Sequence, residues 1–455
     1  IALPNSFEII SLQIQQAYQH ITSAQILIKQ DVGFGESLFS NPSQKLPLSG
    51  ELISVKADLD GDSITLFEGV IVKHKYKNSS NGTRLQLTAK NNIVNMAITT
   101  QAEVFSLQSD KDVIETISSK YGASLNTTKN ITSQLAGKHT QLVKYEVSDW
   151  DFINVRAEAN ACFVYTEKDT IYVDKPSQEI DPAKIITANF GSNVYELELE
   201  QDDRKNQIAY ELINFDLAEL KADVTTDDSI AFSGVTTAIK GKHAFNNYRI
   251  FNEQESTQWL AGNNQVKTIS AINGVVHIHA NLSAKPGGTL TIAGYNDVVD
   301  KSYIITSVLH DYSDGGFSTY LQFGLNHESC ISKYQLTSIH ANPLIVSGIV
   351  AQLQDDPDNL YRIAVTIPSW KDAQNPIWSR MSNIYAGDQY GMVFLPEIGD
   401  EVIVAFMGND MDAPIVLGSA FSPKLPPHTA FKDDNFDKIL ITRSGMKWAW
   451  NDDKL

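Results

Sequence analysis

The chain has 455 residues, of which 42% are hydrophobic and 20% charged, as expected of a folded protein with more than one domain. Its formal net charge of −18 argues against sequence-independent binding of nucleic acid, which depends on Lys and Arg, and gives no support to docking on an anionic membrane. No apolar run approaches the roughly 20 residues of a membrane-spanning helix, and no secretory signal pattern is expected at the start.

Strands are predicted along most of the chain. β-branched and aromatic residues cluster in segments that are separated by Asn-Gly, Asp-Gly and Gly-Gly turns. The clearest of these segments are 64–76, 84–90, 162–174 and 302–312. The chain is therefore expected to be mainly β.

An internal repeat indicates two related β units. HKYKNSSNGTRLQL begins at His74 and HDYSDGGFSTYLQF begins at His310, and both contain His-x-Tyr, a glycine turn and Leu-Gln at the same offset. We interpret the two histidines as hairpin caps. The pattern predicts two antiparallel units, one early and one late, with a helical region inserted between them. A proline and a glycine precede each hairpin: Pro47 with Gly50, and Pro286 with Gly287 and Gly288.

Two helices are predicted in the inserted region. In SDKDVIETISSKYG, Ser109 or Asp110 is the expected N-cap. In SDWDFINVRAEANACFVY, Ser148 is the expected N-cap, and Asp151 provides a variant of the capping box. Asn160 stands where the chain leaves the second helix, because Asn tolerates the left-handed conformation better than most residues.

The last part of the chain has a different pattern. From residue 346 on, about five short strands in roughly 75 residues predict a small Greek-key barrel of the OB type. One of these strands is expected in GMVFLP, residues 391–396. A proline-rich linker, SPKLPPH, and a final segment, KILITRSGMKWAWNDDKL, follow the barrel.

Three carboxylates lie close together in GMVFLPEIGDEVIVAF, at Glu397, Asp400 and Glu401. Such a group suits acid–base catalysis or a hard cation. However, Pro396 lacks the N–H that a strand ladder needs, and Gly399 supplies a permissive backbone for a turn. We therefore interpret this stretch as a solvated β-turn.

Other candidate sites also have simpler interpretations. His277 and His279 would share one face of a strand, which suits a metal, but surface or core histidines are favoured. The segment 286–294 resembles a glycine-rich phosphate loop but leads into a strand. The acidic run 354–359 is interpreted as a solvated loop rather than a weak calcium site. No catalytic, cofactor-binding or metal-ligating residue is predicted.

Two cysteines, Cys162 and Cys330, lie far apart in the sequence. They are able to pair, but two buried free thiols are the favoured interpretation. Free thiols suit a protein that folds in a reducing cytoplasm.

The barrel segment resembles the OB-fold signature of VgrG-type proteins. These are the spike hubs of type VI secretion and of extracellular contractile injection systems, and they are similar to phage baseplate hubs. The matching residues are Trp378, Gly391, Phe394, Pro396, Gly399, Asp400, Glu401, Val402, Phe406, Pro414 and Gly418.

Two further segments resemble the same family. The segment KYEVSDWDFINVRAEANACFVY is similar to the hub helix, with matches at Ser148, Asp149, Phe152, Arg156 and Glu158. The final segment is similar to the entry of a β-helical needle, with matches that include Arg443 and Gly445. In 409–414 the sequence departs from the family's usual Asp-Pro turn, which leaves the conformation of that loop open.

The resemblance implies a mainly β fold with a small α+β insertion. The expected domains are a first phage-hub-like β-barrel (1–105), a helix-containing hub insertion (106–235), a second hub β-barrel (236–335), an OB-fold domain (336–422), and a linker with the start of a β-helical spike (423–455). About 20 residues join the barrel to the final segment, which is too few for a lysozyme domain such as some phage relatives carry.

The resemblance also implies a non-enzymatic homotrimer. Its partners would be the hexameric tail-tube protein, baseplate proteins, a spike-tip protein and effector cargo, and neither a cofactor nor nucleic acid. The protein would be assembled in the bacterial cytoplasm and delivered into target cells as part of a secreted or extracellular injection particle. Two alternatives remain at this point: an OB-fold module that binds oligonucleotide or glycan, and a hydrolase that uses Glu397 and Asp400.

Overall fold

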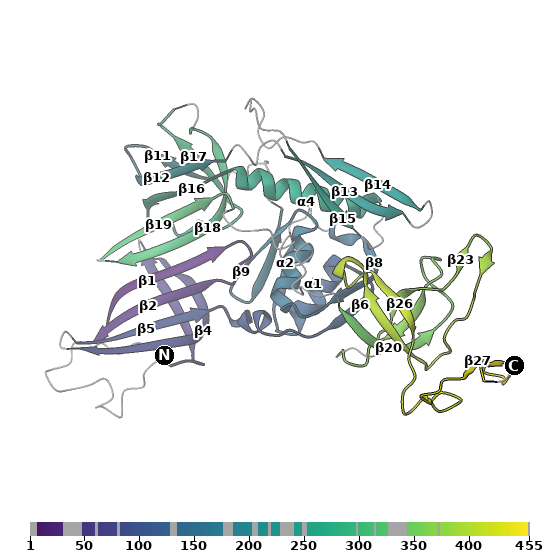
Figure 1. Ribbon diagram of the computed structural model, residues 1–455. Coiled ribbons are helices and arrows are strands. Elements are labelled where there is room, and N and C mark those ends of the chain that lie inside the picture. Colours follow the sequence, from purple (N-terminus) through teal and green to yellow (C-terminus); the bar gives the residue numbers. More distant parts are fainter. Residues whose placement is uncertain are drawn as a thin grey trace.

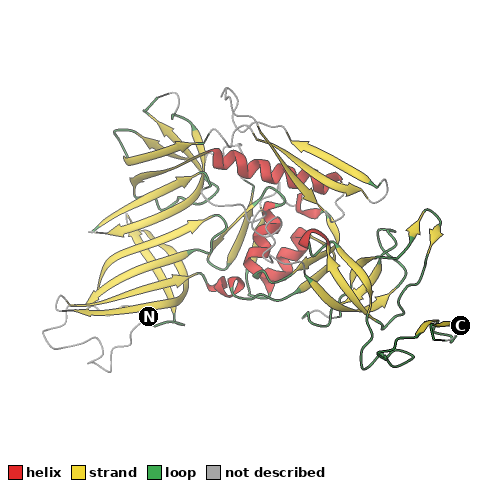
Figure 2. Cartoon of the chain, in the orientation of Figure 1, coloured by secondary structure: helices red, strands yellow, loops and turns green. Residues whose placement is uncertain are grey.

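The computed structural model describes residues 7–30, 48–59, 62–79, 82–127, 134–175, 185–202, 208–216, 220–227, 241–247, 253–296, 299–313, 315–325, 344–370 and 374–453. Strands predominate, as predicted, and the helices gather between the sheets near the centre of the molecule (Figure 2). Pro47 and Cys330 fall outside these ranges. Within them, no helix is both long and apolar enough to cross a membrane.

Two β units with the same topology form most of an eleven-stranded sheet (Figure 1). In each unit the strands lie in the order first, second, fifth, fourth, third, and all neighbours are antiparallel. The first unit consists of β1 (Phe7–Ala17), β2 (Ser23–Gln30), β3 (Leu52–Leu59), β4 (Asp62–Ser79) and β5 (Gly82–Lys90). The second consists of β12 (Val194–Gln201), β16 (Ile272–His279), β17 (Thr289–Ala293), β18 (Ser302–Ser313) and β19 (Gly316–Phe323).

The predicted duplication is confirmed, but the sequence motif that revealed it is two residues out of structural register. The β-bulge of β4 follows Ile71, and that of β18 follows Ile305, so these two residues are equivalent. His74 is therefore equivalent to Val308 rather than to His310. Neither histidine caps a hairpin, contrary to the prediction, because each lies within a strand and faces the neighbouring strand.

The two units are joined edge to edge within the chain. β1 pairs with the C-terminal half of β18, with Leu12 opposite Tyr312 and Ile14 opposite His310. Gln13 donates a side-chain hydrogen bond to Asp311 at 2.8 Å across this pairing. Each unit keeps its own hydrophobic core. The first and second units therefore form one continuous sheet.

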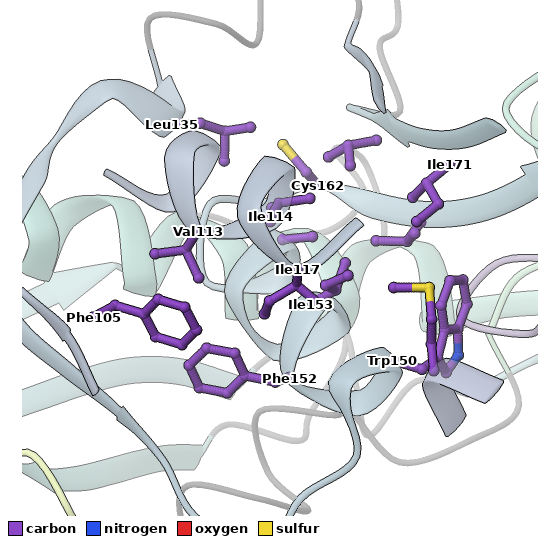
Figure 3. Packing of buried hydrophobic residues seen from close by; sticks show 14 of the residues in the cluster. Phe105, Val113, Ile114, Ile117, Leu135, Trp150, Phe152, Ile153, Cys162 and Ile171 are labelled. Carbon is purple, nitrogen blue, oxygen red and sulfur yellow. The ribbon is translucent and has the colours of Figure 1, made fainter. Parts of the chain in front are cut away.

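A first insertion, between β5 and β11 (Ile185–Asn189), carries two short helices. Its core packs apolar side chains of both helices against Phe105 and Cys162 (Figure 3). The elements are η1 (Asn92–Ala97), β6 (Glu103–Ser109), α1 (Asp110–Ser119), β7 (Ser124–Thr127), η2 (Gln134–Ala136), β8 (Lys138–Lys144), α2 (Asp149–Glu158), β9 (Phe163–Glu167) and β10 (Thr170–Asp174).

Both helices begin where the sequence predicts. Ser109 caps α1 and forms a complete capping box with Asp112, while Ser148 caps α2 by accepting a hydrogen bond from the Asp151 N–H at 3.0 Å. The predicted exit from α2 is wrong in its detail, because Ala161 takes the left-handed conformation, with φ of 59°, in place of Asn160.

A second insertion separates β12 from β16 and was not predicted to contain a helix. It holds a small sheet of β13 (Ile208–Asp216), β14 (Lys221–Asp227) and β15 (Gly241–Asn247), and the helix α4 (Glu253–Ala271). In α4, Gly262 lies so close to α2 that a Cβ would come within 2.3 Å of the Glu158 carbonyl oxygen. The domain boundaries stay predictions; β11 and β12 fall in the range 106–235 but pair with β17 and β16.

The OB barrel is closed, as predicted. Its five strands are β20 (Ile345–Gln352), β21 (Ile363–Thr366), β22 (Ile377–Met381), β25 (Glu401–Phe406) and β26 (Pro414–Ser419). The strand expected over 391–396 is not formed beyond the two residues of β24 (Tyr390–Gly391), which pair with β23 (Ala386–Gly387). A final hairpin contains β27 (Asp437–Ile441) and β28 (Lys447–Asn451).

Candidate functional site

The OB barrel docks on the β6–β8 pair of the first insertion. Val104 of β6 and Val143 of β8 are buried in the same hydrophobic cluster as Val402, Val404 and the other core residues of the barrel. The barrel core therefore extends into the hub. This junction fixes the position of the barrel relative to the two β units.

Hydrogen bonds at the junction fix its register. The Gln141 side chain accepts a hydrogen bond from the Trp378 N–H at 2.6 Å and donates to the Trp378 carbonyl oxygen at 3.4 Å. The carboxylate of Asp412 accepts a hydrogen bond from the Val143 N–H at 2.7 Å. Asp412 lies in the loop 409–414, which departs from the family pattern, and this contact gives that loop a defined role.

The exchange of Gln141 for alanine is expected to weaken this junction. Because Gln141 is buried, the variant leaves both backbone groups of Trp378 without their partner, at a cost of about 1–3 kcal/mol. Urea unfolding of Gln141→Ala should show this loss, whereas Gln86→Ala, at an exposed position of β5, should stay within about 0.5 kcal/mol of the parent protein. Equal stability of both variants and the parent would contradict the prediction.

One buried ion pair anchors the start of α2. Asp149 accepts hydrogen bonds from the Lys144 ammonium group and, at 2.6 Å, from the Tyr121 hydroxyl. Lys144 and Asp149 are each about 1% exposed. The ammonium group also lies 3.9 Å from a carboxylate oxygen of Glu103. A charge pair at this depth is stable only while both members are present.

A second buried network joins α1, α2, α4 and β8. Arg156 contacts both carboxylate oxygens of Asp110, at 2.5 and 3.0 Å, and Asn160 donates to Asp110 at 2.8 Å. His139 lies 3.2 Å from Asp110 and 2.7 Å from Glu255. Burial by itself would raise the pKa of Asp110, but the Arg156 and His139 groups outweigh it and hold the pKa well below its usual range.

His139 makes the stability of this network depend on pH. Burial lowers the pKa of His139, yet hydrogen bonds to Asp110 and Glu255 raise it above the usual value despite the repulsion of Arg156. A raised pKa stabilises the folded state fully below about pH 6.5, and this contribution is lost as the pH rises through the folded-state pKa.

The expected result is that urea unfolding of the parent protein contains a loss of stability from pH 6 to pH 8 that is due to His139, beside the opposite contribution of His310, whose pKa is lowered by burial to about 4. In His139→Gln this contribution to the difference should disappear, because Gln does not titrate. His428→Gln, at an exposed position after the OB barrel, is the matched control and should keep the parent profile. A pH profile that is unchanged by His139→Gln would contradict the assignment.

The other predicted residues of the hub helix are structural. Phe152 stacks on Phe105 with 5.9 Å between ring centroids. Glu158 is fully buried and accepts a hydrogen bond from the Gln19 side chain at 2.9 Å, which ties the end of α2 to the loop after β1. All five matched residues of this helix are buried.

The acidic residues of the barrel turn do not converge on one site. Asp400 accepts a hydrogen bond from the Glu397 N–H at 2.8 Å, which closes the turn. The Glu397 carboxylate forms an ion pair with the guanidinium group of Arg443, in the final segment, at 3.0 Å. The Glu401 carboxylate accepts a hydrogen bond from the Ser347 hydroxyl at 3.1 Å. The three carboxylates thus serve separate contacts, and the geometry fits the predicted solvated turn.

The matched residues of the barrel divide between its core and its extended loop. Val402 and Phe406 are buried in the core, Pro414 begins β26, and Gly418 lies in the same strand. In the loop, Pro396 is buried, whereas Phe394 is 52% exposed. Three positions need glycine: Gly391, Gly399 and, in the final hairpin, Gly445 have φ of 139°, 93° and 89°.

The remaining candidates have structural contacts of their own. His279 stacks on Tyr195, while His277 is tilted against Tyr195 and stacks on Tyr320. No group of three or more His, Cys, Asp or Glu suited to a metal is present among the described residues. Asp356, in the acidic run, is held by Arg362 at 2.6 Å, and backbone N–H groups add to this pairing, so the pKa of Asp356 falls to about 2 although burial opposes it. Cys162 is a buried free thiol.

Four residues that hold these networks together were not predicted: Asp110, Gln141, Lys144 and Asp412 were not assigned as contact residues. The sequence shows no local signal for the contacts of Asp110, Gln141 and Asp412, because the partner of each residue lies far away in the chain. Lys144 precedes Asp149 by five residues, and such a spacing is common among surface charges.

Comparisons with known proteins agree with this architecture. The family model of the Alg8 N-terminal domain matches residues 1–314, and that of the type VI secretion system/phage-baseplate injector OB domain matches residues 346–421. The type VI secretion system spike protein VgrG3 of Vibrio cholerae is 30% identical over 99 residues, which cover 21% of this chain and 10% of that protein. The actin cross-linking toxin VgrG1 of Vibrio cholerae is 44% identical over 57 residues, 12% of this chain and 5% of the toxin.

Solved structures share the fold over most of the chain. A type VI secretion component of E. coli, described as structurally similar to the T4 tail proteins gp27 and gp5, has a TM-score of 0.59 at 12% identity and covers 92% of this chain and 98% of its own. A chain of the Francisella PdpA–VgrG complex has a TM-score of 0.59 at 10% identity, over 98% of this chain and 72% of that one. The chain spans a tenth or less of the two curated relatives. It belongs to the Alg8 N-terminal family and is a VgrG-like protein, with a phage-hub fold followed by the injector OB domain.

Proposed function

We propose that the chain is the structural hub of a contractile injection machine, and that it works as a homotrimer which adapts a hexameric tube to a threefold puncturing spike. The observation that carries the proposal is the duplicated β unit. Two units of one topology are joined edge to edge by β1 and β18, so three chains supply six similar units. A ring of six units fits a hexameric tube, while the OB barrels keep threefold symmetry.

The proposed work is mechanical, and the junction between hub and barrel suits it. A spike that is driven through an envelope must transmit force from the tube to the tip without bending at the OB barrel. The shared hydrophobic core of Val104 and Val143 with the barrel, and the hydrogen bonds of Gln141, provide this stiffness. The described contacts of Glu397, Asp400 and Glu401 offer no converging acid pair, which favours a non-enzymatic role.

The partners follow from the same architecture. We propose that the hub contacts the tube and baseplate proteins through the ring, and a tip protein and effector cargo through the spike. The similar Francisella chain comes from a complex of PdpA with VgrG, which supports the binding of further proteins by this fold. We infer that the chain is delivered to target cells as part of a secreted machine, as the type VI relatives imply.

Native mass spectrometry of the full chain tests this function. The proposal predicts a dominant species of three times the 50.4 kDa chain mass. A stable monomer at micromolar concentration would overturn it. Fluorescently labelled single-stranded DNA in the same buffer tests the OB-module alternative, and salt-sensitive binding of that probe would favour the alternative over the hub.

A further inference from the structure

Among the strand edges of the duplicated sheet that lack a partner strand in the described part of the chain are those of β12 and of the C-terminal half of β4. β12 pairs with β16 on one side only. The C-terminal half of β4, from Lys73 to Ser79, pairs with β5, while β3 pairs only with the part of β4 before Ile71. Unpaired N–H and C=O groups on such edges invite pairing with another chain.

The duplication shows what these two edges are equivalent to. β12 corresponds to β1, and β4 corresponds to β18, in the common strand order of the two units. β1 and the C-terminal half of β18 are paired with each other within the chain. The open edge of β12 is therefore equivalent to the β1 edge that pairs within the chain, and the open edge of β4 is equivalent to that of β18. These two open edges lie toward opposite ends of the continuous sheet.

β-bulges fix the equivalence residue by residue. The bulge of β1 ends at Ser11 and that of β12 ends at Glu196, so Gln13 corresponds to Glu198. The bulges of β4 and β18 end at Lys73 and Ser307, so Lys77 corresponds to Asp311. A hydrogen bond to the residue before each of these two bulges supports the second match: the Gly50 N–H donates to the Ile71 carbonyl oxygen at 2.8 Å, and the Gly287 N–H donates to the Ile305 carbonyl oxygen at 2.9 Å.

When the observed pairing of β1 with β18 is transferred to β12 and β4, acids fall opposite bases. Gln13 lies opposite Asp311, and Gln15 lies opposite Leu309. The transferred pairs are Glu198 with Lys77, Glu200 with Lys75 and Asp202 with Lys73. On the other face of the strands, Leu199 meets Tyr76, in the place where Ile14 meets His310.

The charges make this match specific. Lys73, Lys75 and Lys77 are exposed on one edge, and Glu198 and Glu200 are exposed on the other. Lysines alone on an edge strand serve to prevent edge-to-edge association. A matching row of carboxylates on the one edge that the duplication aligns with them instead indicates a complementary partner, since opposite charges directly across a strand pair are stabilising.

We propose that the β4 edge of one copy pairs antiparallel with the β12 edge of a second copy, with Lys77, Lys75 and Lys73 opposite Glu198, Glu200 and Asp202. This inference rests on the proposed homotrimer and specifies its interface. Three such pairings in a closed ring would join six β units into one continuous sheet, in which interfaces within and between chains alternate.

Charge reversal and rescue test the proposal. Lys75→Glu with Lys77→Glu places like charges across each interface, and the dissociation constant of the trimer should rise at least about tenfold. Glu198→Lys with Glu200→Lys should do the same. The fourfold variant that combines all these changes should recover the trimer, because every pair is again opposite in charge. Lys56→Glu, at an exposed position of β3, is the control and should stay trimeric.

Cysteine pairs test the register. Lys77→Cys with Glu198→Cys places two thiols at directly opposite positions, where the separation of Cα atoms suits a disulfide, and oxidation should give covalent trimers on a denaturing gel. Lys75→Cys with Glu198→Cys is two residues out of register and should remain mostly uncrosslinked. Cys162 should not interfere, because it is buried and burial raises the pKa of its thiol to about 12.

The possible outcomes distinguish a failure of the proposed β4–β12 interface from a failure of the proposed trimer. If the parent protein is trimeric and the reversed variants dissociate while the fourfold variant recovers, the proposal stands. If the parent is trimeric and the folded reversed variants are unaffected, the β4–β12 interface is wrong while the proposed function survives. If the parent is a monomer, the proposed function fails. Circular dichroism of each variant confirms that the fold is retained.

Discussion

Replacement of Asp149 by alanine is expected to destabilise the folded chain by about 3–5 kcal/mol. The variant leaves the Lys144 ammonium group, only about 1% exposed, without its closest carboxylate, and it removes the acceptor of the Tyr121 hydroxyl. Glu103, at 3.9 Å, is too far away to replace Asp149 fully. The large effect reflects the cost of an unpaired buried charge rather than the net value of the pair.

Urea unfolding of Asp149→Ala measures this loss directly. The control is Glu115→Ala, which removes the partly exposed Lys111–Glu115 pair of α1, with 3.5 Å between the charged groups. Surface pairs of this kind contribute about 0–1 kcal/mol to stability, so the free energy of unfolding of the control should stay close to that of the parent protein. The double variant Lys144→Met with Asp149→Leu should recover much of the lost stability, because it removes both charges. A loss below about 1 kcal/mol in Asp149→Ala would show that the pair does not anchor α2.

Arg156→Ala is the second change with a large expected effect, again about 3–5 kcal/mol at neutral pH. Asp110 then keeps Asn160 and His139 as partners but loses the guanidinium group that contacts both of its oxygens. The packing between the start of α1 and the end of α2 should loosen at the same time. Thermal unfolding followed by circular dichroism is a suitable measurement.

The pH dependence identifies the cause. The pKa of Asp110 is depressed in the folded parent, so its contribution to stability is present above the unfolded pKa of about 3.9 and is lost as the pH falls. The gap between Arg156→Ala and the parent should therefore narrow toward acidic pH. A constant gap between about pH 5 and about pH 2 would mean that the variant acts through lost packing instead of lost charge. The double variant Asp110→Asn with Arg156→Met should lose less stability than Arg156→Ala alone, because it removes both charges of the buried pair.

Local patterns in the sequence predicted the elements well where local chemistry decides them. The caps of α1 and α2 depend on serines and acids three residues apart, and both caps form as expected. The OB barrel follows from short alternating strands between turn residues, and every expected strand segment except 391–396 contributes to its closure. The segment 391–396 failed because most of its apolar residues are exposed and only two residues find a partner strand.

Features set by distant contacts could not be predicted. α4 has an interior Gly262 and several β-branched and Asn residues, which are poor helix formers, and its packing on α2 overrides this propensity. Gln141 finds its partner Trp378 237 positions along the chain. The internal repeat was visible, yet its shared letters lie two residues away from the true equivalence, which only the β-bulges of β4 and β18 establish.

A cryo-electron microscopy reconstruction of the purified full chain tests the central claim most directly. The hub account predicts a closed particle with threefold symmetry, in which six similar β units form one ring and three OB barrels lie together on one side. Reconstruction without imposed symmetry should show sheet density that continues from β4 of one copy to β12 of the next. A monomer, or a closed assembly of two or four chains, would contradict the account.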